Sequence, residues 1–333
     1  MLAIVAPGQG SQKPGMLAPW LEVPGLAERA ATLSDAAGID LVRLGTTAGA
    51  DEIKDTAVTQ PLVVVAALLA ARQLDIPAAA VAGGHSVGEL AAAAIAGVIS
   101  DGEAAALAGV RGRAMAAACA LTPSSMAVVL GGNGEVVTAR LAELELTGAN
   151  VNGAGQVVAA GELAKIETLL AEGVDGARVM PLAVAGAFHT HYMASAQAAF
   201  ASYVAALSGT TPTRALLTNA DGCLVADGPA YLQLLITQIT RPVRWDLCME
   251  TLAAQGVTGV LELPPAGALV GLVKRQLKGT ATLALKGPED LDKAIAFMAE
   301  HSQVQPEHSQ VQPEHSQVQQ IHAGHGNSAG ESL

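Results

Sequence analysis

Several features are scarce in this sequence of 333 residues, and each scarcity excludes a class of protein. Aromatic residues make up 2% of the chain and charged residues 14%, whereas hydrophobic residues make up 51%. A large core is therefore available, and small side chains must pack its helices and strands closely. Acidic residues outnumber basic ones, 30 to 18, and the net charge of −12 argues against nucleic acid as a partner.

Signals for disulfides, secretion and membrane spans are also scarce. The segment Met1–Ala6 has no basic n-region, so we expect a first strand there and no signal peptide. The longest apolar run, Pro61–Ala71, is too short to span a bilayer. No C-x-x-C pair is present, which favours reduced thiols in a cytoplasmic protein; the three cysteines are Cys119, Cys223 and Cys248.

One motif that is present combines a serine with flanking glycines. The run Gly84-His85-Ser86-Val87-Gly88 fits the G-x-S-x-G nucleophile elbow. An apolar run precedes it and a helix-forming run follows, so the hydroxyl is expected above a sheet, beside backbone N–H groups. The alternative is a plain tight turn that packs a helix on a sheet.

Strand-like and helix-like segments alternate along most of the chain, which predicts an α/β fold with a mostly parallel sheet covered on both faces. Within residues 122–186, short strands and two helices follow an order that resembles a ferredoxin-like unit. The expected strands are Met126–Gly131, Val157–Gly161 and Ala177–Leu182, and the expected helices are Glu135–Leu144 and Leu163–Ala171. We therefore expect this unit to be a subdomain inserted into a larger α/β body, residues 1–121 and 187–300. A cleft between the two is a natural ligand site.

The C-terminal part carries a seven-residue repeat. Each unit has one apolar residue and usually a proline, which excludes a coiled coil. We predict a disordered tail over residues 301–333. Five of the eight histidines lie in this tail, where we expect solvated side chains and no metal site.

Outside the tail, three histidines could act as the base for Ser86, namely His85, His189 and His191. Consecutive side chains at an elbow point apart, so His85 is predicted to support the turn through a hydrogen bond. His189 follows a strand-like run and precedes a helix, where α/β serine enzymes supply their base, and it is favoured over His191. No carboxylate lies near His189 in the sequence, so we expect a carbonyl group to orient its imidazole.

Two further segments indicate an acyl-binding site. The loop Pro7–Gln12 is glycine-rich, and its N–H groups can stabilise an oxyanion; a phosphate-binding role competes, but no phosphate-binding motif is present. The N–H of Val87 is the expected second donor. Arg111 lies in an apolar, alanine-rich helix, where it either binds a substrate carboxylate or extends to solvent.

Together these residues resemble the malonyl-CoA:acyl carrier protein transacylase family of fatty-acid synthesis, in its actinobacterial form, over residues 1–298. The resemblance implies an α/β-hydrolase-like body with an inserted ferredoxin-like subdomain. It also implies ping-pong transfer of a malonyl group through a malonyl-serine, with malonyl-CoA as a substrate and no cofactor. The motifs that carry it are Ala6–Gln12, Gly84–Glu89, Arg111-Gly112 with Met115, Asn150–Gly153 with Gly155-Gln156, Gly186–Thr190 and Pro242–Trp245.

The resemblance also implies roles for single residues. Ser86 looks like the nucleophile and His189 like its base. The N–H groups of Gln9 and Val87 look like the oxyanion-hole donors. Gln238 falls where the family uses a main-chain carbonyl to orient the histidine.

Substrate selection is implied in the same way. Arg111 matches the carboxylate-binding arginine of the family, with Met115 in the same motif. Phe188, next to the base, goes with malonyl groups, whereas a serine there goes with methylmalonyl in related domains. His85 is expected to support these residues without reacting.

The implied partner is an acidic acyl carrier protein, of fatty-acid or polyketide synthesis. Because this chain is acidic too, docking needs a basic patch, and Lys274, Arg275 and Lys278 are the candidates; a solvated face is the alternative. We expect a monomer. A serine esterase is disfavoured by Arg111 and by the missing carboxylate, and an inactive carrier-binding module by the intact set of Ser86, His189 and Arg111.

Overall fold

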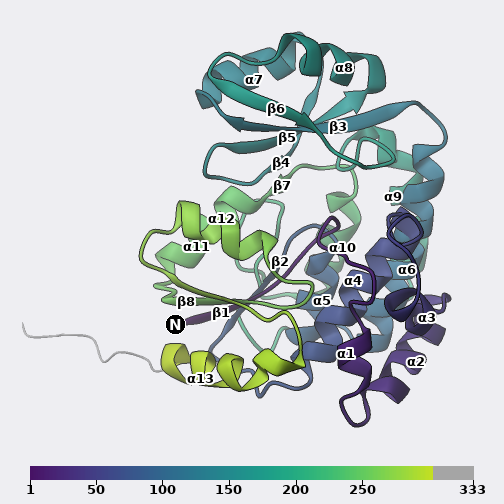
Figure 1. Ribbon diagram of the computed structural model, residues 1–333, viewed down its shortest axis with the longest axis vertical. Coiled ribbons are helices and arrows are strands. Elements are labelled where there is room, and N and C mark those ends of the chain that lie inside the picture. Colours follow the sequence, from purple (N-terminus) through teal and green to yellow (C-terminus); the bar gives the residue numbers. More distant parts are fainter. Residues whose placement is uncertain (303–333) are drawn as a thin grey trace, which may run out of the picture. The chain divides into compact units, whose positions relative to one another are not determined.

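The computed structural model describes residues 1–302, in which helices pack around two β-sheets (Figure 1). The four strands of sheet A are all parallel and lie in the order β2–β1–β8–β9. They are β1 (Leu2–Ala6), β2 (Val81–Gly84), β8 (Gly259–Glu262) and β9 (Ala281–Ala284). The predicted α/β class with a mostly parallel sheet is therefore confirmed.

The side chains of β1 alternate between two cores, one on each face of sheet A. Leu2 and Ile4 belong to the core that contains α4 (Thr56–Ala71), α5 (Gly88–Ile95) and α6 (Asp101–Cys119). Ala3 and Val5 belong to the core with α11 (Trp245–Ala254) and α12 (Ala268–Gln276). A strand buried on both faces needs no polar alternation, which explains the continuous apolar run at the start of the sequence.

Helix α4 contains the longest apolar run and is buried along almost its whole length. A helix that is apolar on every side is expected in the interior of a fold. Its N-terminus is capped by Asp55, whose carboxylate accepts the N–H of Ala57 at 2.8 Å. None of the helices among residues 1–302 combines the length and apolarity that crossing a membrane requires.

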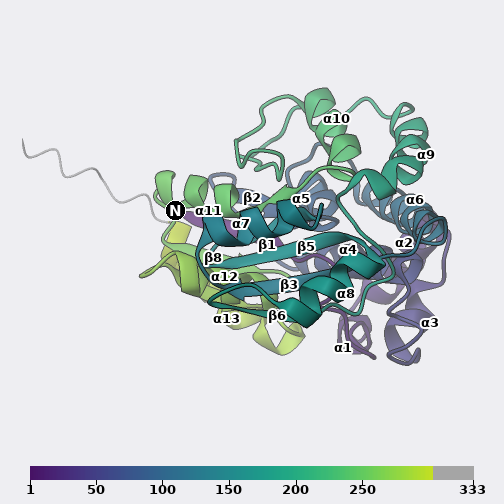
Figure 2. The ribbon, with the colours of Figure 1, turned by 90° about the horizontal axis from the view of Figure 1, so that it is seen from above.

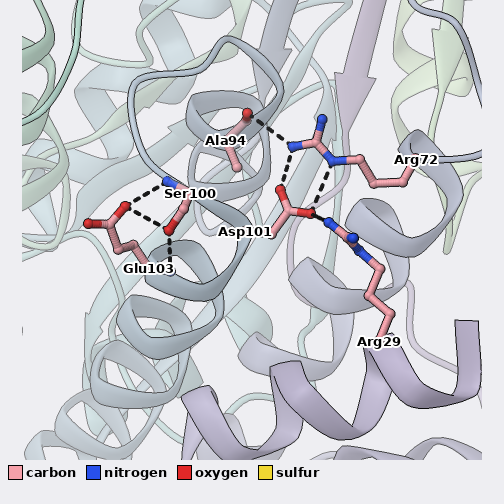
Figure 3. A network of polar contacts seen from close by, with 6 residues as sticks. All are labelled: Arg29, Arg72, Ala94, Ser100, Asp101 and Glu103. Carbon is pink, nitrogen blue, oxygen red and sulfur yellow. Dashed lines mark hydrogen bonds and ion pairs between the residues drawn. The ribbon is translucent and has the colours of Figure 1, made fainter.

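Helix α6 is fixed at its N-terminus by two sets of polar contacts (Figure 3). Ser100 and Glu103 form a capping box. Asp101 accepts hydrogen bonds from Arg29 on α2 (Leu26–Ala37) and from Arg72 at the end of α4. These contacts join three helices at the start of α6.

Sheet B contains five strands in the order β6–β3–β5–β4–β7. They are β3 (Ser124–Gly131), β4 (Thr147–Val151), β5 (Gln156–Glu162), β6 (Ala177–Pro181) and β7 (Val243–Arg244). Helices α7 (Gly134–Glu143) and α8 (Leu163–Glu172) cover one face, in front of the strands in Figure 2. The order β-α-β-β-α-β over β3 to β6 is that of a ferredoxin-like unit, as predicted, with β4 as a strand that the sequence did not predict. The boundaries at residues 122 and 186 stay a prediction.

The remaining helices complete the body. They are α1 (Ala18–Leu21), α3 (Leu41–Thr46), α9 (Ala194–Val204), α10 (Gly228–Gln238) and α13 (Leu291–Ser302), with short 3-10 turns at His191–Met193 and Pro288–Asp290. Helix α13 extends past residue 301, where we predicted the tail to begin. His301 accounts for this, because its Nδ1 lies 3.0 Å from the hydroxyl of Thr258. The rest of the predicted tail lies outside the described residues.

Candidate active site

Ser86 lies on a sharp turn between β2 and α5. Its φ is +54°, a left-handed value that is strained for a residue with a side chain. A Cβ on Gly84 would lie 2.1 Å from the carbonyl carbon of Gly88, and one on Gly88 would lie 2.3 Å from the oxygen of Ala6. Only glycine therefore fits on either side, and the turn has the geometry of the predicted elbow.

The hydroxyl of Ser86 meets the imidazole of His189, with 2.7 Å between Oγ and Nε2. On the other side of the ring, Nδ1 lies 2.8 Å from the main-chain oxygen of Gln238. A carbonyl oxygen only accepts, so Nδ1 carries the proton and Nε2 accepts from the serine. His191, the alternative base, is exposed and packs its ring against Tyr192.

Two causes keep His189 neutral. Burial lowers its pKa to about 3, and the positive charge of Arg111 acts in the same direction, against the hydrogen bond to the Gln238 carbonyl. The backbone of His189 also has a left-handed φ, +60°. A neutral imidazole with a free lone pair on Nε2 can accept the proton of Ser86.

Arg111 is 2% exposed and points toward Ser86. Its Nη2 donates to the Oγ of Ser86 at 3.3 Å and to the side-chain oxygen of Gln238 at 2.8 Å. Its Nη1 donates to the side-chain oxygen of Gln60 at 2.7 Å. Burial lowers the pKa of Arg111 to about 10, so the guanidinium stays charged at neutral pH. A side chain in this position does not extend to solvent.

The predicted oxyanion donors lie beside the elbow. A Cβ on Gly8 would lie 2.9 Å from the carbonyl oxygen of His85, so the loop after β1 approaches the elbow closely. The main-chain N–H groups of Gln9 and Val87 donate to no other group within residues 1–302. The N–H of Ser86 is different, because it donates to the side-chain oxygen of Asn219 at 2.7 Å.

The other predicted residues surround this group. His85 Nε2 lies 2.8 Å from Oδ1 of Asn152, and Phe188 forms part of the cavity wall. Met115 is buried, and its sulfur accepts a hydrogen bond at 3.4 Å from Gln60, the partner of Arg111. His85 and Phe188 therefore lie beside Ser86 and His189, and Met115 contacts the glutamine that binds Arg111.

Ser86 and His189 open into a cavity of about 530 Å³ between the elbow, α12 and sheet B. Apolar side chains of sheet B and the loop that follows it form one wall, namely Met126, Val128, Leu130, Val158, Met180, Leu182 and Val184. Arg275 lines the cavity from α12 and donates to the side chain of Gln156 at 3.2 Å. Lys274 and Lys278 are exposed nearby in sequence, Lys278 just beyond the end of the helix.

Three residues in contact with the site were not singled out from the sequence. Asn219 holds the elbow from both ends, because its side-chain oxygen accepts from Ser86 and its Nδ2 donates to the oxygen of Gly84 at 2.7 Å. Glu89 accepts the backbone N–H of Asn219 at 2.6 Å. Gln60 binds Arg111. Gln60 and Glu89 could have been noticed in the sequence, because each is a polar residue within an apolar helical run.

Comparisons with known proteins agree on one group of enzymes. Residues 4–322 match the family model of the acyl transferase domain. The malonyl CoA-acyl carrier protein transacylase of Mycobacterium tuberculosis is 51% identical over 302 residues, covering 88% of this chain and 99% of that protein. The protein of the same name from Mycolicibacterium smegmatis is 53% identical over 285 residues, covering 83% and 98%.

Solved structures give the same result. The crystal structure of MCAT from Mycobacterium tuberculosis has a TM-score of 0.86 and 50% identity, and the match covers 89% of this chain and 99% of that one. A malonyl-transacylase in complex with its type II polyketide acyl-carrier protein has a TM-score of 0.82 and 31% identity, with coverage of 89% and 99%.

Proposed function

Because this chain belongs to the acyl transferase family, and within it to the malonyl CoA-acyl carrier protein transacylases, we propose that it moves a malonyl group from malonyl-CoA to the phosphopantetheine thiol of acyl carrier protein. The chain is an acyltransferase. One observation carries the choice of acyl group: a buried guanidinium, Arg111, and a neutral base, His189, both point at the hydroxyl of Ser86. A nucleophile beside a fixed positive charge suits an acyl group that ends in a carboxylate.

In the first half-reaction, Ser86 is acylated. Nε2 of His189 takes the hydroxyl proton while Oγ attacks the thioester carbon of malonyl-CoA. The N–H groups of Gln9 and Val87 stabilise the oxyanion. The C–S bond then breaks, and the proton on Nε2 passes to the sulfur, so that CoA leaves as a thiol.

The second half-reaction runs the same steps in reverse. His189 takes the proton of the phosphopantetheine thiol, and the sulfur attacks the ester carbon of malonyl-Ser86. The ester C–O bond breaks, and Oγ recovers the proton from Nε2. Because CoA leaves before the carrier thiol attacks, one cavity serves both substrates in turn. The proposed reaction uses no cofactor.

Substrate selection by Arg111 gives a direct test. Wild-type protein should acylate Ser86 with malonyl-CoA at least 100-fold faster than with acetyl-CoA, because acetyl has no carboxylate to pair with the guanidinium. Methylmalonyl-CoA should be slower than malonyl-CoA, since Phe188 occupies the cavity wall. In Arg111→Ala the preference for malonyl should disappear. Single-turnover acylation by the three esters measures this, and an unchanged malonyl preference in Arg111→Ala would contradict the assignment.

Carrier docking is proposed at the C-terminal end of α12. Arg275 lines the mouth of the cavity, and Lys274 and Lys278 are exposed beside it in the sequence, so an acidic carrier would meet positive charge there. Reversing Lys274 and Lys278, which do not line the cavity, to Glu should raise the KM for carrier protein at least tenfold while the KM for malonyl-CoA changes little. An unchanged KM for carrier protein would remove this patch from consideration.

The carrier itself is proposed to be that of fatty-acid synthesis. The relatives carry the general name of acyl carrier protein transacylases, while one solved relative binds a carrier of polyketide synthesis. Comparing kcat/KM for the two purified carriers separates these uses of the same chemistry. A cytoplasmic monomer is the form proposed for the enzyme, and the mass of the purified protein in solution tests the oligomeric state.

A further inference from the structure

The reaction proposed above makes no use of a carboxyl group that lies behind Ser86. Glu89, in the first turn of α5, is 1% exposed. Donors face both of its oxygens: Oε1 accepts from the backbone N–H of Asn219, and Oε2 accepts from the side-chain Nε2 of Gln238. A buried carboxyl group is expensive in free energy unless it is fully hydrogen-bonded, so its presence calls for a physical reason.

The side-chain amide of Gln238 links Glu89 to Arg111. Its Nε2 donates to Glu89 and, at 3.0 Å, to the main-chain oxygen of Ser86. Its Oε1 is therefore turned the other way and accepts from Nη2 of Arg111 at 2.8 Å. Because both oxygens of Glu89 accept hydrogen bonds in this arrangement, the NH₂ end of the amide faces Glu89 and its oxygen faces the guanidinium.

We infer that Glu89 is a positioning residue for carboxylate recognition, which acts through the side chain of Gln238 to fix the guanidinium of Arg111 over Ser86. The inference rests on the proposed role of Arg111 as the group that binds the malonyl carboxylate. It gives Gln238 a second task. Its main chain orients His189, and its side chain orients Arg111.

The arrangement also explains why the guanidinium remains able to bind an anion. Within residues 1–302, Arg111 donates only to uncharged acceptors, the side chains of Gln60, Gln238 and Ser86. A carboxylate in direct contact would occupy the guanidinium that the substrate needs. Glu89 lies one residue further away, with the uncharged amide of Gln238 between its carboxyl group and the guanidinium.

The test is Glu89→Gln, which preserves size but offers one acceptor oxygen where two donors point. The amide of Gln238 should turn over to avoid facing a second NH₂ group, and it would then present its own NH₂ to Arg111. We expect the ratio of malonyl to acetyl acylation rates, measured in single turnovers, to fall at least tenfold. The acylation rate with acetyl-CoA should fall much less, because an acetyl group has no carboxylate to bind the guanidinium.

Asp101→Asn is the matched control. It removes another largely buried carboxyl group that binds arginines. Asp101 lies on the same helix as Arg111, but ten residues before it, which is about 15 Å along the helix axis. It should lower the melting temperature and leave the malonyl-to-acetyl ratio as in wild type. The inference is overturned if Glu89→Gln retains the wild-type ratio, or if it slows both esters equally, as a purely structural role would.

Gln238→Met provides a second test if Glu89→Gln does not fold. It keeps the main-chain carbonyl that holds His189 and removes the amide. The malonyl-to-acetyl ratio should fall at least tenfold. Where Glu89→Gln does fold, the double variant should show no further loss, because both changes break one connection. A folded Gln238→Met with the wild-type ratio contradicts the inference. If wild-type protein itself shows no preference for malonyl-CoA, the proposed function fails first, and this inference fails with it.

Discussion

At the scale of single residues, burial sets the charges of the candidate site. His189 is kept neutral, while Arg111 stays charged because its pKa, though lowered by burial, remains near 10. Burial also raises the pKa of Glu89 to about 8, against the hydrogen bonds from Asn219 and Gln238 and the charge of Arg111. A neutral base and a charged guanidinium beside one hydroxyl are what the proposed transfer requires.

The neutral state of His189 predicts a specific sensitivity to acid. The folded pKa of about 3 lies below the ordinary value of 6.5, so between these values the unfolded chain binds more protons. The stabilisation is complete above pH 6.5 and is lost as the pH falls toward 3. Relative to His189→Gln, wild-type protein should lose about 1 kcal/mol of unfolding free energy for each pH unit below 6.5.

Urea unfolding at pH 7, 6 and 5 measures this difference. Glu89 has the opposite pH dependence, but it is present in both proteins and cancels in the comparison. Ser86→Ala is the control, since it keeps the buried imidazole and should follow the wild-type curve. Parallel curves for wild type and His189→Gln would show that the imidazole is not held neutral.

At the scale of elements, the sequence was informative wherever a local rule decides the structure. Gly84 and Gly88 predicted the elbow because only glycine fits there. The apolar run before Pro7 predicted a buried parallel strand. Strand β4 was missed, because Gly148 and Asn150 are poor strand formers and pairing with β5 and β7 is what makes the segment extended.

Helix α6, which carries Arg111, begins with a buried carboxylate that stabilises the packing of three helices. Asp101 is 7% exposed, and two arginines from other helices converge on it (Figure 3). Asp101→Asn should reduce the free energy of unfolding by about 2 kcal/mol, because the charge-assisted hydrogen bonds are lost while both arginines remain.

Chemical denaturation compares this variant with Glu52→Gln. The pair Arg43–Glu52 has a similar bidentate contact but is exposed, so its loss should change the unfolding midpoint little. Equal effects of the two variants would show that burial of Asp101 does not strengthen its ion pairs.

At the scale of the whole described chain, the candidate site depends on contacts between segments far apart in the sequence. His85 on the elbow binds Asn152 from the β4–β5 connection, and the main-chain N–H of Ala154 donates to the side chain of Gln276 at 2.7 Å. Strand β7 joins sheet B although it lies about 90 residues after β4 in the sequence. Sheet B supplies a wall of the cavity into which Ser86 opens.

These long-range contacts mark the limit of prediction from sequence. The motifs around Ser86, Arg111 and His189 were recognised, and the structure brings all three together. Asn219 and the side-chain role of Gln238 were not recognised, because their importance comes from partners more than 100 residues away. A sequence motif predicts a local turn. No local sequence pattern predicts the contacts of the Gln238 side chain, because its partners lie on separate segments.

The proposed malonyl-Ser86 intermediate can be detected directly from the intact mass of the protein after incubation with malonyl-CoA. We expect one malonyl adduct on wild-type protein, none on Ser86→Ala, and loss of the adduct when holo acyl carrier protein is added. Steady release of CoA without an adduct would indicate a thioesterase. An adduct that persists in Ser86→Ala would contradict the assignment of the nucleophile. The absence of both an adduct and CoA release would contradict the assignment of the protein as a transferase.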